Sequence, residues 1–363
     1  YAANPLDPLG RPHVYTHWWL HLRDLGLTRA HNVWVGFALG GAFFAMAVAR
    51  LRPASGGQLV WYLALLGSPP VILALNRANN DLVVFLLLAA VVPCLLSPQR
   101  WVRMAAVVPI AIATGLKFYP AAAAFVLLYG DGSREVRGRL LLAGLVLAVV
   151  GVDLIPDLKR FGGFGFKAGG LTSFGSANLL EFFGVHGLPA LLTGVAFTAS
   201  VMAVCWRLKL FSGWTIAPGD RAAWLSFVLG AVLLTACFFT GTNFAYRWIF
   251  ALWLAPLLWT LPRDPRAPVA VRRWATVTAG LLIVVIWADP LASSALYAVH
   301  KSLPPGTVVR WANKFILLEQ PLVWAFFAGL IGLLAHFARD GWRILRPVGD
   351  ASRPGWTPTT LRQ

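Results

Sequence analysis

The chain of 363 residues is 58% apolar and only 12% charged, with a mean hydropathy of +0.68 and a formal net charge of +17. Soluble domains carry about 25% charged residues, so this composition excludes an ordinary cytosolic enzyme, a disordered chain and a nucleic-acid-binding domain. Long apolar runs recur along the whole length, which predicts an all-α polytopic membrane protein. The three cysteines lie inside apolar runs, so no disulfide framework is indicated.

Eleven apolar segments are predicted to be transmembrane, although several are shorter than the about 20 residues that cross a bilayer core of roughly 30 Å. In chain order they are 33–49, 58–75, 82–96, 104–116, 118–129, 140–156, 187–206, 222–240, 249–262, 274–288 and 316–337. The two shortest flank Lys117-Phe118-Tyr119-Pro120, where the proline ends or kinks a helix. This pair forms either two short crossings or a re-entrant hairpin, and in both cases its two ends lie on one side.

The loop charges orient the bundle. With the amino terminus outside and the segments alternating, the inside loops hold most of the Lys and Arg residues, as cytoplasmic loops do. We therefore expect residues 1–32 to be an extracytoplasmic first loop with interfacial helices, and 338–363 to be a cytoplasmic basic tail. The transmembrane domain spans 33–337, with outer loops near 157–186 and 289–314. If the complete protein starts in the cytoplasm, a first helix precedes Tyr1 and the bundle has 12 segments.

Three polar clusters lie at the predicted outer ends of the helices. They are Asn76-Arg77-Ala78-Asn79-Asn80-Asp81, Lys117-Phe118-Tyr119-Pro120 and Thr242-Asn243-Phe244-Ala245-Tyr246-Arg247. Ionisable groups at membrane depth are costly and by default indicate a functional site. Three such clusters on one face predict one shared site that faces outward.

The residue types narrow the chemistry of this site. Positive charge from Arg77, Lys117 and Arg247 fits a phosphate. The carboxylates of Asp7 and Asp81 could take a proton from a hydroxyl. The remaining candidates could contact a sugar, through the amides of Asn79, Asn80 and Asn243 and the aromatic faces of Tyr119 and Tyr246.

Each candidate also has a simpler interpretation. Lys117 could be a snorkelling lysine at a kink, and Arg247 an interfacial arginine on a lipid headgroup. Arg77 and Asp81, one helical turn apart, could pair with each other. A helix N-cap could explain Asn79 or Asn80, and a turn before proline could explain Asp7.

The histidines of the first loop raise the question of a metal. His17 and His21 stand four residues apart, but together with His13 they form no closed ligand pattern, so we expect no metal and keep His17 as a substrate contact. The stretch from Lys159 to Lys167 is glycine-rich, and we expect a mobile loop over the site rather than a ligand cradle.

At these residues the chain resembles the glycosyltransferase 87 family. Arg77-Ala78-Asn79-Asn80-Asp81-Leu82 is similar to the family signature Arg-Gly-Asn-x-Asp-Leu, and Gly115-Leu116-Lys117-Phe118-Tyr119-Pro120 to its Leu-Lys-x-Tyr-Pro motif. Asn243-Phe244-Ala245-Tyr246-Arg247-Trp248-Ile249-Phe250 resembles an Asn-x-x-Tyr-Arg-x-x-Phe motif of one bacterial branch, and Asn4-Pro5-Leu6-Asp7-Pro8 with Tyr15 resembles that branch's first outer loop. The resemblance covers about residues 1–260.

The resemblance implies a GT-C-like bundle in the bacterial plasma membrane with its active site on the extracytoplasmic side. It further implies an inverting mannosyltransferase that uses polyprenyl-phosphate mannose and a lipid or glycan acceptor, without metal or cofactor. An aspartate of the first outer loop would be the base, here Asp7 or a residue before Tyr1; the branch usually has another aspartate where Ala245 stands. Lys117, Arg247 and Arg77 would bind the donor phosphate, and Lys117→Ala would abolish transfer in a folded protein.

Two other classes remain open at this point. A lipid-linked sugar transporter or flippase would need access to both membrane faces, whereas the polar clusters lie on one predicted face and no inverted repeat is evident. A non-catalytic membrane scaffold, derived from such an enzyme by loss of its base, is the other alternative.

Overall fold

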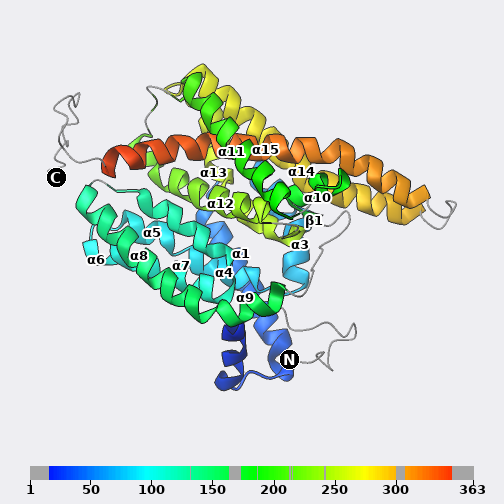
Figure 1. Cartoon of the computed structure of the whole chain (residues 1–363), viewed down its shortest axis with the longest axis horizontal. Helices are drawn as coiled ribbons and strands as arrows, with labels where there is room; N and C mark the ends of the chain where they lie inside the picture. Colours follow the sequence, from blue (N-terminus) through cyan, green and yellow to red (C-terminus); the bar gives the residue numbers. More distant parts are fainter. Residues whose placement is uncertain are drawn as a thin grey trace.

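The computed structural model describes residues 16–130, 132–162, 173–185, 187–211, 214, 216–240, 243–299 and 307–345. Helices account for most of these residues (Figure 1). Within the described part, the strands are two residues long each: β1 (Ser173–Phe174) pairs antiparallel with β2 (Asn243–Phe244). The all-α class predicted from composition is therefore confirmed for the described chain.

Five helices are long and apolar enough to cross a membrane. They are α1 (Asn32–Arg50), α11 (Gly187–Arg207), α12 (Arg221–Phe239) and the larger parts of α14 (Val269–Val299) and α15 (Thr307–Leu345). A sixth candidate is the pair of α2 (Gly56–Leu66) and α3 (Pro69–Asn76), which is bent by 51°. The bend follows from Pro69 and Pro70, because proline donates no backbone hydrogen bond and is best tolerated in a helix's first turn. These helices support a membrane protein, and the larger number of eleven crossings stays a prediction.

Apart from the 21-residue α8 (Ser133–Asp153), the remaining helices and turns are short. In the middle of the chain these are α4 (Asp81–Leu88), α5 (Val91–Leu96), α6 (Arg100–Ala105), α7 (Val107–Leu116) and η3 (Tyr119–Leu128). Later come α9 (Ile155–Gly162), α10 (Ser176–Phe182), η4 (Pro218–Asp220), η5 (Ala245–Trp253), α13 (Ala255–Thr260) and η6 (Leu261–Arg263), and η1 (His17–Leu25) and η2 (Arg29–His31) precede α1. After the break at Lys117, α7 and η3 pack against each other, which fits both two short crossings and a hairpin.

The predicted outer loops contain more helix than expected. In the region near 157–186, α9 continues to Gly162 and α10 adds a further helix. In the region near 289–314, α14 extends to Val299 and α15 already begins at Thr307. These two long helices pack along each other, and this contact carries the helical conformation beyond the apolar segments (Figure 1). For the same reason the tail expected from residue 338 is helical as far as Leu345.

Aromatic side chains form the core between α12, η5 and α15. The rings of Phe238 and Phe327 stack at 4.0 Å, and Trp248 packs against the same Phe327 at 6.0 Å. The outer surface of α8 instead exposes a stripe of apolar side chains at helical spacing: Leu141, Leu145, Val149 and Val152. An exposed apolar stripe of this kind fits a helix that faces lipid.

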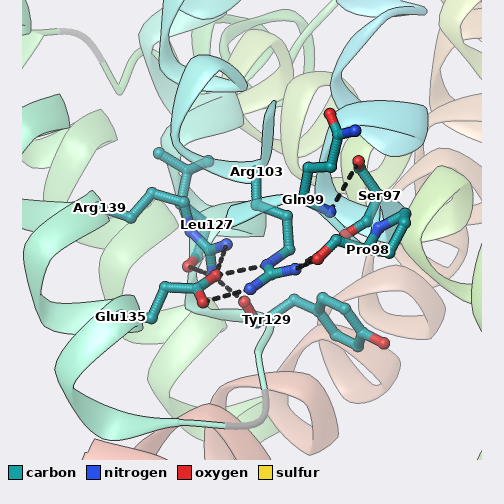
Figure 2. A network of polar contacts seen from close by, with 8 residues as sticks. All are labelled: Ser97, Pro98, Gln99, Arg103, Leu127, Tyr129, Glu135 and Arg139. Atoms are coloured by element: carbon teal, nitrogen blue, oxygen red, sulfur yellow. Dashed lines mark hydrogen bonds and ion pairs between the residues drawn. The ribbon is translucent and has the colours of Figure 1, made fainter. Parts of the chain in front are cut away.

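At the end of the bundle opposite the three polar clusters, a network of polar contacts joins α6, α8 and the end of η3 (Figure 2). Arg103 holds Glu135 through two hydrogen bonds of 2.7 and 2.6 Å. Arg139 is fully buried, contacts Glu135 at 3.3 Å and donates to the carbonyl oxygens of Leu127 and Tyr129. The hydrogen bonds from Arg103 lower the pKa of Glu135 below its ordinary value, so the carboxylate stays ionised between two cations.

This network makes a testable contribution to stability. Glu135→Gln is expected to lower the free energy of unfolding by about 2–3 kcal/mol, because a buried arginine loses its carboxylate. A lowered pKa stabilises the fold above the unfolded value of about 4.3, so the difference from wild type should be largest at neutral pH and should be lost as the pH falls below this value, through the lowered pKa of Glu135. Denaturant unfolding of the detergent-solubilised protein, at neutral pH and at a pH below about 4, measures this difference. Asp220→Asn, which breaks an exposed pair with Arg266, is the control and should change little.

Candidate functional site

The turn between α3 and α4 places Asp81 inside the bundle. Ala78 has a φ of 40°, a left-handed conformation that the chain uses to reverse direction between the two helices. The side-chain oxygen of Asn79 then accepts a hydrogen bond of 2.9 Å from the backbone N–H of Asp81, which starts α4. As a result the Asp81 carboxylate points into the protein and is 0% exposed.

The break after α7 brings two partners to this carboxylate. Helix α7 ends at Leu116, and Lys117 continues in an extended conformation. The ammonium of Lys117, itself 7% exposed, forms an ion pair with the Oδ1 atom of Asp81. The hydroxyl of Tyr119 donates a hydrogen bond of 2.7 Å to the same oxygen. Both partners are thus held against α4 by a kink that proline enforces at the start of η3.

The third cluster approaches from η5. The Nε atom of Arg247 lies 3.8 Å from Asp81 Oδ2, and its guanidinium carbon lies 4.7 Å from the centre of the Tyr119 ring. The Tyr246 ring faces Lys117, with the ammonium 5.8 Å from the ring centre. Asn243 fixes the start of this segment, because it lies in β2 and donates to the Cys237 carbonyl oxygen.

The three clusters therefore meet at one group of charges. One carboxylate faces two cations, Lys117 and Arg247, so the group carries a net charge of +1. Neither Asp81 Oδ2 nor Arg247 Nε has a hydrogen-bond partner in the described chain, and the Arg247 guanidinium makes a long contact of 3.9 Å with the Cys237 sulfur. A guanidinium has five N–H donors. Arg247, with its side chain 21% exposed, keeps donors for an anion that arrives from outside the group.

Two of the simpler interpretations, a snorkelling Lys117 and an Arg77–Asp81 pair, are wrong, and so is the expectation that Asp81 takes a proton from a hydroxyl. Lys117 does not snorkel to the surface, because it is buried and paired with Asp81. Arg77 is exposed and makes no ion pair within the described residues; the neighbouring Asp81 turns inward to Lys117 instead. The full burial of Asp81 in this conformation also keeps it away from a substrate hydroxyl.

The remaining predicted contacts are divided between the group and its surroundings. Three of them are buried and act within the group. Asn79 supports the turn before α4, Asn243 supports β2, and the Tyr246 ring lies against the Lys117 side chain. Asn80 is the residue before α4, but its side chain makes no capping hydrogen bond and its Oδ1 atom is buried without a partner in the described chain. Asp7, His13 and Thr242 lie outside the described residues.

His17 lies in a second polar cluster, whose carboxylates sequence reasoning missed. Its Nδ1 atom lies 2.9 Å from Asp157 Oδ2, and its Nε2 atom lies 3.3 Å from Asp153 Oδ2. Both aspartates sit at the end of an apolar segment, where the sequence shows only a helix terminus. His21 pairs separately with Asp24. Among the described residues no group of three potential ligands could hold a metal ion.

No protein-family model, curated protein or solved structure matches the chain. The fold and the charges define a class nonetheless: a helical protein, with helices suited to a membrane, that holds a buried cationic group next to ends of several helices. Such a group is suited to bind an anion, since Arg and Lys donate charge-assisted hydrogen bonds to phosphate or carboxylate oxygens.

Proposed function

We propose that the chain is an integral membrane glycosyltransferase that moves a sugar from a polyprenyl-phosphate donor to an extracytoplasmic lipid or glycan acceptor with inversion. Mannose is the sugar that the family resemblance implies. Arg247 and Lys117 bind the donor phosphate, and the exposed Arg77 meets it at the rim of the site.

The main support for this proposal is the excess positive charge of the buried group. Burying an unpaired cation is costly, yet here two cations share one carboxylate, and Arg247 Nε lacks a hydrogen-bond partner in the described chain. A phosphate oxygen would accept from the unused guanidinium donors and would balance the excess charge. A purely structural ion pair would need neither the second cation nor its partial exposure.

An apolar groove supports a lipid-linked donor over a soluble one. It has a volume of about 390 Å³ and lies between α4, α5 and α7, lined by Val83, Leu86, Leu87, Ala90, Cys94, Val108, Pro109 and Ile112. Asp81 starts α4 and Lys117 follows α7, so the groove begins within two turns of both charged residues. A hydrocarbon chain in this groove would therefore have its head group near the end of the bundle where the cations lie.

The same geometry gives a mechanism. The acceptor hydroxyl attacks the anomeric carbon, and the bond from this carbon to the phosphate oxygen breaks with its electron pair on the leaving polyprenyl phosphate. Arg247 and Lys117 stabilise the negative charge that develops on the leaving group. An outer carboxylate takes the hydroxyl proton; the resemblance implies Asp7 for this role.

The backbone conformation offers a physical reason for one position of the family signature. The family signature has glycine where Ala78 stands, and Ala78 has a positive φ, the conformation that glycine adopts without strain. This turn directs Asp81 inward. The signature therefore matches what the turn needs, a residue suited to a positive φ followed by the aspartate that becomes buried.

The test is transfer of radiolabelled mannose from polyprenyl-phosphate mannose, with other lipid-linked sugars in parallel, in membranes that express the full-length gene. We expect a labelled lipid or glycan product that is missing from control membranes. If folded protein transfers no sugar from any donor of the panel, the enzyme is excluded. Donor movement across vesicles would then support the transporter, and neither activity would support the scaffold.

A further inference from the structure

Thr16 and the start of η1 cap the end of α7, the helix that Lys117 follows. The hydroxyl of Thr16 and the indole N–H of Trp19 both donate to the Leu116 carbonyl oxygen, at 3.1 and 2.8 Å. The Trp18 ring lies directly on Gly115, where a Cβ atom would come within 2.3 Å of the ring. A helix end leaves carbonyl oxygens without partners, so this segment completes α7 at the residue that precedes Lys117.

The same segment ties α7 to a pair of carboxylates at the junction of α8 and α9. Trp18 donates its indole N–H to Asp153 Oδ2 at 2.7 Å. Next to it, Asp157 Oδ2 accepts from the backbone N–H of His17 and contacts the ring atom Nδ1, both at 2.9 Å. The Trp18 indole thus contacts both Asp153 and Gly115, which lies two residues before Lys117, so this carboxylate lies near the end of α7.

The two carboxylates differ in exposure. The Asp157 side chain is 5% exposed and the Asp153 side chain is 48% exposed. Asp157 is therefore placed to fix the orientation of the imidazole, because its Oδ2 atom accepts a hydrogen bond from Nδ1 when that atom carries the ring hydrogen. The Oδ2 atom of Asp153 accepts from Trp18 and lies next to His17. These two contacts orient a carboxylate that is accessible from solvent.

With a neutral imidazole at His17, this cluster has room for one more proton. With the ring hydrogen on Nδ1, the His17 Nε2 atom has a lone pair that faces Asp153 Oδ2 across 3.3 Å. A lone pair and a carboxylate oxygen repel each other, and a proton between them turns this contact into a charge-assisted hydrogen bond. A buried acid, an imidazole and an acceptor in sequence is the arrangement by which enzymes hold a proton taken from a hydroxyl.

We propose that Asp153, supported by His17 and Asp157, is the proton acceptor of the transfer reaction. The O–H bond of the acceptor breaks as its oxygen bonds to the anomeric carbon, and the proton moves to Asp153, where His17 Nε2 shares it. Polyprenyl phosphate leaves with the electron pair of the broken bond. This inference rests on the proposed function, and it assigns the base to α8 rather than to Asp7.

The test compares single variants of the full-length protein in the transfer assay. Asp153→Asn keeps the size and the acceptor oxygen for Trp18 but cannot take the proton, so kcat should fall at least 100-fold with unchanged affinity for polyprenyl phosphate. Asp153→Gly should regain activity with added formate, a rescue that a merely structural carboxylate would not show. Asp24→Asn, which breaks the exposed pair with His21 on the same segment, is the matched control and should keep full activity.

The outcomes separate this inference from the proposed function. If wild type transfers sugar and Asp153→Asn keeps more than a third of its kcat, the assignment to Asp153 is overturned and the glycosyltransferase stands. Loss of activity in Asp7→Asn, with Asp153→Asn active, would return the base to the first loop. A wild-type protein that transfers nothing overturns both proposals.

Discussion

Arg247→Gln should reduce sugar transfer by about 10²–10³-fold, the effect of removing one donor that stabilises charge in a transition state. Glutamine keeps much of the side-chain volume but loses the charge and most of the N–H donors. The fold should tolerate this change, because the Arg247 Nε atom lies 3.8 Å from Asp81 Oδ2, too far for a close hydrogen bond, while Lys117 keeps the carboxylate paired. Steady-state transfer rates and denaturant unfolding of the same preparation measure both effects.

A matched control for Arg247→Gln stands on the exposed surface. Arg263 is exposed and lies over the ring of Trp259, with its guanidinium carbon at 3.6 Å from the ring centre, and it is not part of the charged group. Arg263→Gln should leave the transfer rate within a factor of two. Equal losses in both variants would show that overall charge, and not the site, affects the assay.

Lys117 calls for a paired experiment, because its removal affects stability as well as transfer. In Lys117→Met the Asp81 carboxylate, which is 0% exposed, keeps only Tyr119 and the more distant Arg247. Breaking a buried pair in this way lowers the free energy of unfolding by about 3–5 kcal/mol. The expectation from sequence that Lys117→Ala leaves a folded protein is therefore at odds with the ion pair.

The double variant Lys117→Met with Asp81→Asn separates the two effects. Both charges are gone, so the buried carboxylate no longer lacks a partner, and most of the lost stability should return. Transfer should stay at least 100-fold below wild type, since the phosphate has lost one of its cations. Full activity in the stable double variant would show that Lys117 has only a structural role.

The sequence predicts the helical class well because a lipid environment demands long apolar helices, and these runs are visible in the composition. It also identifies Asp81, Lys117 and Arg247, because charges directly at the ends of apolar segments are conspicuous. Their partners are harder to predict. Arg77 lies one turn from Asp81 and is the obvious local partner, but across the left-handed turn at Ala78 the Asp81 side chain is buried and Arg77 is exposed.

The second cluster is beyond sequence reasoning for a related reason. Asp153 and Asp157 follow an apolar stretch and look like the polar end of a helix. Their relation to His17 depends on the path of a segment more than 130 residues earlier, which docks because Gly115 leaves space for the Trp18 ring. Long-range contacts of this kind have no periodic signal in the chain. The number of crossings is obscured as well, because prolines such as Pro120 and Pro256 divide apolar segments into short helices.

We have proposed that the charged group of Asp81, Lys117 and Arg247 binds the phosphate of a lipid. The most direct measurement is the affinity of the purified full-length protein for polyprenyl phosphate, with polyprenol as the uncharged control, for wild type and Arg247→Gln. We expect wild type to bind polyprenyl phosphate at least tenfold more tightly than Arg247→Gln does, and we expect polyprenol to bind both proteins equally. Equal affinity of both proteins for polyprenyl phosphate would contradict this proposal.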